Sequence, residues 1–185
     1  NRKMVIQLWR EEYDKADETY RWNLAEIERL NHNEYYGYLH MDYGKGLYAI
    51  NPEKALSEMK KAYAIFVENK NEYRRKIDCC CEVEYLECLI APSKSVDDLK
   101  CAVDRLRTEH YYELYVKGAL KVATILILKE HRNSFFSEIE NYIYYASYYM
   151  PYEQIGRLKR LFNIVEKAYI DSSNGKPVTI DSRIW

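Results

Sequence analysis

Apolar side chains recur every three or four residues along most of the chain, which is the period of an α-helix that buries one face. Short polar breaks divide this pattern into eight predicted helices. With only 6 Gly and 4 Pro in 185 residues, the chain lacks the turn residues that a β-sandwich or a β-barrel needs between its strands. The pattern therefore predicts an all-α fold, with helices that begin at about residues 2, 34, 52, 72, 96, 111, 134 and 152.

The first and the sixth of these predicted helices differ in their apolar pattern. We expect the first to run unbroken over residues 2–30, because one apolar stripe that includes Trp9 continues through it. The sixth, over about residues 111–131, is apolar on nearly all sides between Ala119 and Leu128. Such a helix needs neighbours on more than one side, so we expect it at the centre of the fold.

Several helix ends carry local signals. Asn51 followed by Pro52 is typical of an N-cap and a first helical residue. Ser95 is expected to cap the fifth helix in the same way. Gly44 and Gly46, near the end of the second helix, either weaken that helix or let a neighbouring helix approach closely.

The five cysteines do not have the spacing of a disulfide framework or of a metal site. Cys79, Cys80 and Cys81 are consecutive, and adjacent residues on a helix point about 100° apart and cannot pair with one another. The cysteines also lack the Cys-x2-Cys spacing of a zinc knuckle. We therefore expect no metal and no cofactor, and reduced thiols that pack in the core of a cytoplasmic protein.

The charge balance limits the classes of partner. The chain has 28 Lys plus Arg against 29 Asp plus Glu and a net charge of -1, which argues against nucleic-acid or membrane binding by bulk charge. Its longest apolar run, residues 119–128, is too short for a transmembrane helix, and its first residues do not have the pattern of a secretory signal. Because the chain begins with Asn in helical period, we expect it to be a segment of a longer polypeptide.

Short breaks between helices predict successive antiparallel hairpins, since a short loop places each helix beside the previous one. We expect one helical domain over residues 1–170. Residues 171–185 lose the helical period and are predicted to form an extended tail, which either folds back onto the helices or stays disordered.

One stretch of the chain, residues 43–66, has an aromatic-rich helix, a short turn and a second helix with small residues at Ala55 and Ala62 and the larger Met59 between them. This stretch resembles a tetratricopeptide repeat (TPR). The resemblance implies helical hairpins stacked as a TPR-like α-solenoid, a class of fold that binds proteins or peptides.

The same resemblance indicates candidate partner contacts. If Ala55 occupies the small-residue position of the repeat, His40 and Tyr43 face or border the concave side, with Arg74 and Asp78 as their counterparts on the fourth helix. We predict that these four side chains contact a protein or peptide partner.

The Arg-Ile-Trp ending of the chain resembles the tails of large ATP-binding signalling proteins of bacteria. Together with the TPR resemblance, it implies a non-catalytic sensor or scaffold segment of a larger regulatory protein. Contact with other domains of the parent chain, or self-association as a structural arm, are further alternatives.

An enzymatic alternative rests on Arg105 and His110. Their Arg-x4-His spacing resembles the pair of the small helical HEPN ribonucleases, in which it attacks the RNA backbone. Seven of the 20 tyrosines lie between Tyr142 and Tyr169, and such rings either stack on single-stranded nucleic acid or pack between helices. We favour helix packing, because these tyrosines recur at core spacing.

Overall fold

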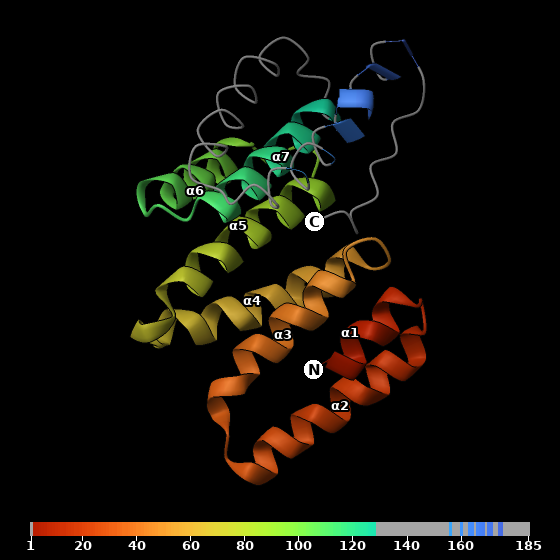
Figure 1. The fold of residues 1–185 in the computed structure, drawn as a ribbon, viewed down its shortest axis with the longest axis vertical. Coiled ribbons are helices and arrows are strands. Elements are labelled where there is room, and N and C mark those ends of the chain that lie inside the picture. Colours follow the sequence, from red (N-terminus) through yellow and green to blue (C-terminus); the bar gives the residue numbers. More distant parts are fainter. Residues whose placement is uncertain are drawn as a thin grey trace. The chain divides into compact units, whose positions relative to one another are not determined.

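The computed structural model describes residues 2–128 and, after them, residues 156, 160, 163, 164, 166–168, 170, 171, 174 and 175 (Figure 1). Within residues 2–128 the chain is helical and contains no β-strand, which confirms the all-α prediction for this part. Two short 3-10 turns, η1 and η2, precede α3 and α5. The elements are α1 (Arg2–Trp9), α2 (Tyr13–Leu30), η1 (Asn33–Tyr35), α3 (Tyr36–Gly46), α4 (Pro52–Glu68), η2 (Lys70–Glu72), α5 (Tyr73–Ile90), α6 (Asp97–Thr108) and α7 (Tyr112–Leu128).

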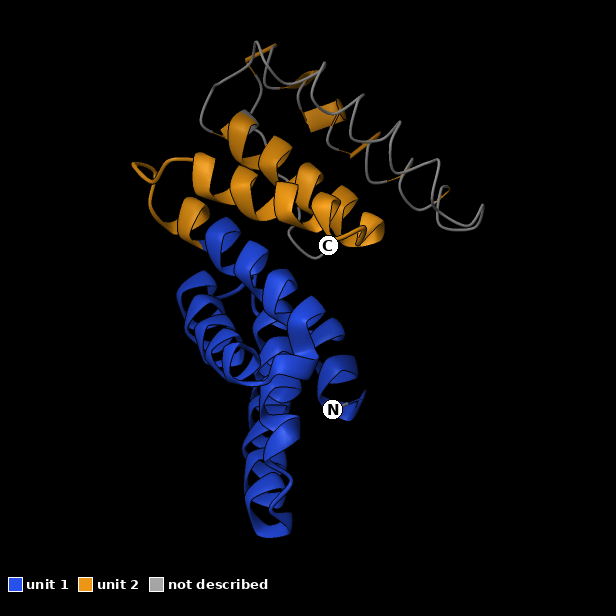
Figure 2. Ribbon diagram, turned by 90° about the vertical axis from the view of Figure 1, so that its left-hand side faces the viewer, with its two compact units in different colours: residues 1–86 blue, residues 87–185 orange. Residues whose placement is uncertain are grey.

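The chain divides into two compact units, Asn1–Leu86 and Glu87–Trp185 (Figure 2). The first holds α1 to α4 and most of α5, and the second holds the end of α5 together with α6 and α7. The single domain predicted over residues 1–170 stays a prediction. The helices predicted from residues 134 and 152, the tyrosines between them and the tail over residues 171–185 lie largely outside the described residues.

The unbroken helix predicted over residues 2–30 is wrong, because the chain reverses between α1 and α2. Glu11 takes the left-handed conformation, with φ of 61°. The amide of Glu12 donates to the carbonyl of Gln7 at 2.9 Å and that of Glu11 donates to the carbonyl of Leu8 at 3.1 Å, which is the Schellman pattern of a helix C-terminus. The reversal leaves Trp9 77% exposed rather than in the core.

The predicted start of α4 is confirmed. The side-chain oxygen of Asn51 accepts a hydrogen bond from the amide of Lys54 at 2.9 Å, and Pro52 is the first helical residue. At α6 the cap position falls on Val96 instead of Ser95, although the Ser95 hydroxyl accepts from the amide of Asp97 at 3.2 Å.

The apolar helix predicted near residues 111–131 is α7. Every residue between Leu114 and Leu126 except Lys117 is buried. Antiparallel α6 packs against it through a close crossing, where a Cβ added to Gly118 would lie 2.7 Å from a methyl carbon of Val103.

Glycines also bring α3 and α4 together as an antiparallel hairpin. A Cβ at Gly37 would lie 2.8 Å from the ring of Phe66, and one at Gly44 would lie 3.2 Å from the carbonyl oxygen of Ala55. Of the two interpretations of Gly44, close approach of a neighbouring helix is therefore the correct one.

Successive hairpins in residues 2–86 stack in the same orientation. Asp17 contacts Lys54 and Tyr20 contacts Glu58, so α2 runs parallel to α4. In the same way Lys45 contacts Asp78 and Tyr48 contacts Glu82, so α3 runs parallel to α5. The helices thus pack sequentially as antiparallel hairpins whose equivalent members lie side by side, as expected from the short breaks.

Candidate functional site

A buried polar cluster lies where α2, α3 and α4 meet. The Tyr20 hydroxyl donates to Oε2 of Glu58 at 2.5 Å, and Nδ1 of His40 lies 2.7 Å from the same oxygen. The other carboxylate oxygen, Oε1, accepts from Nζ of Lys61 at 2.7 Å. Because Tyr20, His40 and Glu58 are at most 9% exposed, this cluster joins three helices away from bulk water.

The electrostatics of this cluster favour an ionised Glu58. Burial by itself would raise the pKa of the Glu58 carboxyl, but hydrogen bonds from His40, Lys61 and Tyr20 outweigh burial and lower that pKa to about 2. Burial and the hydrogen bond to Glu58 raise the pKa of Tyr20, so its hydroxyl stays protonated. Since an ionised carboxylate only accepts hydrogen bonds, Nδ1 of His40 carries the hydrogen that it shares with Glu58.

A second group of side chains adjoins the first. The hydroxyl of Tyr43 donates to Oδ1 of Asp17, and Nζ of Lys54 donates to the same oxygen at 2.7 Å and to the Tyr43 hydroxyl at 2.8 Å. The hydrogen bonds from Lys54 and Tyr43 lower the pKa of Asp17. The rings of Tyr43 and Tyr20 stack with centroids 4.0 Å apart, which joins the two groups.

A third group connects α3 with α5. Nζ of Lys45 lies 3.1 Å from Oδ2 of Asp78 and 3.4 Å from Oε1 of Glu82. The Tyr48 hydroxyl donates to Oε2 of Glu82 at 2.6 Å. Burial would lower the pKa of Lys45, but the charges of Glu82 and Asp78 raise it, so the amine stays protonated between two acids.

The structure brings together only some of the four predicted partner contacts. His40 and Tyr43 lie in the adjoining groups of α2, α3 and α4, whereas Asp78 pairs with Lys45. These three side chains are buried, and Arg74 is exposed near the start of α5. The buried positions suit side chains that hold helices in place, and a direct partner contact by any of the four stays a prediction.

Arg105 and His110 lie at the end of α6. Both residues are exposed, and His110 follows the helix in the left-handed conformation, with φ of 60°. Nδ1 of His110 lies 2.6 Å from the hydroxyl of Tyr112. This hydrogen bond and the helix-ending backbone give His110 a structural role that the Arg-x4-His spacing did not indicate.

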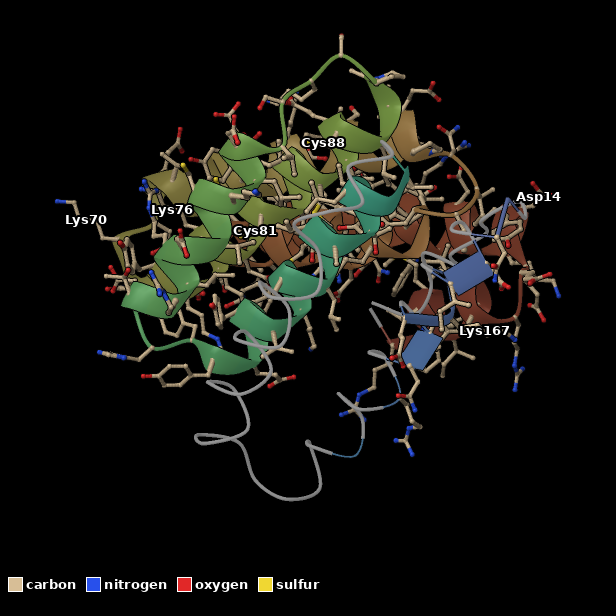
Figure 3. All side chains as sticks on the ribbon, turned by 90° about the horizontal axis from the view of Figure 1, so that it is seen from above. Asp14, Lys70, Lys76, Cys81, Cys88 and Lys167 are labelled. Atoms are coloured by element: carbon tan, nitrogen blue, oxygen red, sulfur yellow. The ribbon has the colours of Figure 1, made fainter. Side chains whose placement is uncertain are left out.

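The cysteines are free thiols. Cys81 and Cys88 lie on the same helix, α5 (Figure 3), and both are buried, as is Cys79. Burial raises the pKa of the Cys79 thiol, which favours an inert packed side chain over a nucleophile. No group of three or more metal-binding side chains occurs among the residues that the structure describes.

A groove of about 760 Å³ lies between α1 and α2 in the first unit. Trp22 in its wall is 62% exposed, an unusual position for so large an apolar ring. Sequence reasoning missed this groove, because it depends on the reversal at Glu11 that folds α1 back onto α2. Trp22 lies off the apolar stripe of its helix, and that offset was the available signal. The groove is lined by Arg2, Lys3, Glu18, Thr19, Trp22 and Asn23.

The polar side chains of the groove are not neutralised by their neighbours. Within residues 2–128, Arg2, Lys3 and Glu18 form no ion pair, unlike Arg21 and Asp17 on the same hairpin, whose charged atoms are 2.6 Å apart. Nδ2 of Asn23 is buried without a hydrogen-bond acceptor. A concave surface with unpaired charged side chains and an exposed aromatic ring is suited to hold another molecule.

No described helix has both the length and the apolar composition that a bilayer crossing requires. Comparison of the chain with known proteins gives no match to a family model, to a curated protein or to a solved structure.

Proposed function

We propose that this chain is a non-catalytic, TPR-like helical-repeat module that binds a protein or peptide partner and serves as a sensor or scaffold segment of a larger regulatory protein. The observation that carries the proposal is the α1–α2 groove, whose charged side chains are unpaired and whose Trp22 ring is exposed. Tryptophan and arginine are the residues most enriched at the energetic centres of protein interfaces.

The stacked hairpins support this function because they supply a rigid surface. Each of the three polar groups in residues 2–86 connects helices of different hairpins, so the hairpins are held in fixed positions next to one another. A preformed surface loses less conformational entropy when a partner binds than a flexible loop does. In helical-repeat proteins, stacking of this kind produces extended surfaces that recognise partners by shape and scattered side chains.

The chain also offers a matched pair of tryptophans for a test. Trp9 and Trp22 belong to the same hairpin and are both well exposed, at 77% and 62%, but only Trp22 lines the groove. Replacement of either ring removes a similar exposed apolar area, so a difference between the two variants reports on the groove itself.

The experiment is an affinity purification of residues 1–185 from lysate of the source organism, with Trp22→Ala and Trp9→Ala in parallel. We expect a protein that is retained in stoichiometric amount by the wild type and by Trp9→Ala and is lost from Trp22→Ala. Equal retention by all three forms would contradict the proposal. Co-purified RNA that is cleaved by the wild type and left intact by His110→Ala would instead favour a HEPN-type ribonuclease that uses Arg105 and His110.

A further inference from the structure

The groove between α1 and α2 contains more hydrogen-bond donors than acceptors. Arg2 and Lys3 form its α1 side and carry two positive charges without an ion-pair partner in the described chain. Nδ2 of Asn23, beneath the surface of the groove, is buried and also lacks an acceptor. Among the described residues of the lining Glu18 is the single acid, so this part of the groove is cationic although the whole chain has a net charge of -1.

We propose that this groove binds an acidic peptide segment of a partner protein, in which a carboxylate side chain contacts Arg2 and Lys3 and an adjacent apolar side chain packs on Trp22. This inference rests on the proposed function and specifies the chemistry of its ligand.

The carboxylate part of the inference follows from the two cations. A guanidinium group binds a carboxylate through two parallel hydrogen bonds, and hydrogen bonds between ionised partners are about twice as strong as neutral ones. The partner charge also compensates Arg2 and Lys3, which form no ion pair within residues 2–128. Such contacts increase the association rate and the specificity, and they weaken as salt is added.

The apolar part follows from Trp22. A tryptophan ring that is 62% exposed presents a large rigid apolar surface, which gains free energy when a leucine-sized side chain covers it. The ring lines the same groove as Arg2, Lys3 and Glu18, so the apolar contact and the charged contacts are available to one ligand.

Glu18 favours a peptide over a nucleic acid. A nucleic-acid strand carries a negative charge at every phosphate, whereas a peptide can place a carboxylate beside Arg2 and Lys3 and a neutral backbone segment beside Glu18. A peptide backbone has N–H groups that donate to the Glu18 carboxylate and C=O groups that accept from the Arg2 and Lys3 side chains. The lining therefore matches the alternating donors and acceptors of an extended peptide.

The inference is tested with the full chain and three fluorescein-labelled peptides in fluorescence anisotropy. The acidic peptide alternates Glu and Leu with Ser, and in the two matched peptides Gln or Lys replaces every Glu. We expect the acidic peptide to bind about tenfold more tightly than the Gln peptide and the Lys peptide to bind most weakly. Binding of the acidic peptide should also weaken as sodium chloride is added.

Two matched pairs of variants locate the binding. Arg2→Glu should weaken the acidic peptide about tenfold, whereas Arg10→Glu should leave its affinity within about twofold. Arg10 is exposed, has no ion pair in the described chain and lies outside the groove, so it controls for the change in total charge. Trp22→Ala should weaken the same peptide and Trp9→Ala should not. Circular dichroism of each variant verifies that the helices are intact.

Three results would overturn the inference. The first is equal affinity for the Glu and Gln peptides, and the second is equal loss in Arg2→Glu and Arg10→Glu. The third is tighter binding of an oligouridylate than of the acidic peptide. Each of these results would leave the proposed function open to its own test. A protein that is retained by the wild type and lost from Trp22→Ala in the affinity purification would still support that function, so failure of the inference and failure of the proposed function can be told apart.

Discussion

Tyr43 donates its hydroxyl hydrogen to Asp17 across 26 residues of sequence, and Lys54 contacts both groups from a third helix. The same pairing of a tyrosine hydroxyl with a carboxylate recurs in the first unit. Each ring packs between helices, and each hydroxyl reaches an acid of another element. This arrangement gives the high tyrosine content a structural function in this unit. The other pairs are Tyr20 with Glu58, Tyr38 with Glu72 and Tyr48 with Glu82.

A double-mutant cycle measures the first of these pairs. Tyr43→Phe keeps the stacked ring and removes the hydroxyl, so it should lower the free energy of unfolding by about 1–2 kcal/mol. Asp17→Asn should also destabilise the fold. The loss of unfolding free energy in the double variant should be smaller, by about 1 kcal/mol, than the sum of the losses in the two single variants. The measurement is urea unfolding followed by circular dichroism. Tyr35→Phe, at a 53% exposed ring, is the control and should be nearly neutral, and strict additivity would contradict a Tyr43–Asp17 interaction.

Acid should destabilise the first unit through Glu58. The pKa of this carboxyl is about 2 in the folded chain and 4.5 in an unperturbed chain, so its contribution is complete above pH 4.5 and is lost as the pH falls towards 2. We expect a loss of about 3 kcal/mol in the free energy of unfolding over that interval, measured by urea unfolding at a series of pH values.

Glu58→Gln provides the control for the acid prediction, because it removes the titrating group. Its stability should be lower than that of the wild type at neutral pH and should change less between about pH 5 and pH 2. Some dependence of stability on pH should remain in this variant, because the pKa of Asp17 is also lowered in the folded chain. Glu53→Gln, at an exposed acid of the same helix, should retain the wild-type profile. An unchanged profile in Glu58→Gln would show that Glu58 does not stabilise the fold in this way.

The close crossing of α3 and α4 predicts that a methyl group added at Gly37 destabilises the fold. Gly37→Ala would place its Cβ 2.8 Å from the Phe66 ring, which is 1% exposed and has little room to move. We expect a loss of about 1–3 kcal/mol in the free energy of unfolding, measured with urea. Gly156→Ala is the control, because nothing lies within 4 Å of its added Cβ, and this variant should be neutral or slightly stabilising. Equal effects at both glycines would argue against the crossing.

The left-handed backbone at Glu11, where α1 ends, predicts that a substitution there can increase stability. A residue with φ of 61° is strained unless it is glycine, so Glu11→Gly should stabilise the fold by about 1 kcal/mol. Asn31 ends α2 in the same conformation, but asparagine tolerates it, and Asn31→Gly should gain less. Thermal unfolding of the two variants measures the difference. Destabilisation by Glu11→Gly would show that interactions of the Glu11 side chain exceed its backbone strain.

Thiol reactivity should differ sharply along the chain. Cys101 is exposed, whereas Cys79, Cys81 and Cys88 are at most 3% exposed. In the native protein we expect Cys101 to react with a disulfide reagent at the rate of a free thiol and these three to react only on unfolding. Peptide mass spectrometry after a short iodoacetamide pulse assigns the sites. Cys101→Ser should remove the fast phase and Cys88→Ser should keep it, and rapid labelling of Cys79 would contradict its burial.

Local signals predicted the parts of the fold that local chemistry determines. Asn51 and Pro52 start α4 because the cap is made within four residues, and the apolar stretch that includes Ala119 is buried in α7 as its composition requires. The reversal at Glu11 was not predictable in the same way. It uses a charged residue where glycine is usual, and the apolar stripe continues across it from one helix to the next.

The site was less accessible to sequence reasoning than the fold. The sequence proposed His40 and Tyr43 as partner contacts, which stays a prediction. Their hydrogen-bond partners Glu58 and Asp17 lie 18 and 26 residues away in the sequence and depend on how the hairpins stack. The groove around Trp22 required the three-dimensional fold of α1 on α2.

The parallel alignment of α2 with α4 and of α3 with α5 determines the register of the stack. Apolar faces alone tolerate a slip of one helical turn, about 5.4 Å, because one aliphatic side chain can replace another. A slip of that size would separate Lys45 from Asp78 and Tyr20 from Glu58, and it would leave buried acids without donors. The polar pairs thus select one of several nearly equivalent alignments of the helices. Tyrosine hydroxyls and Lys45 determine which alignment forms, because each must reach one particular acid.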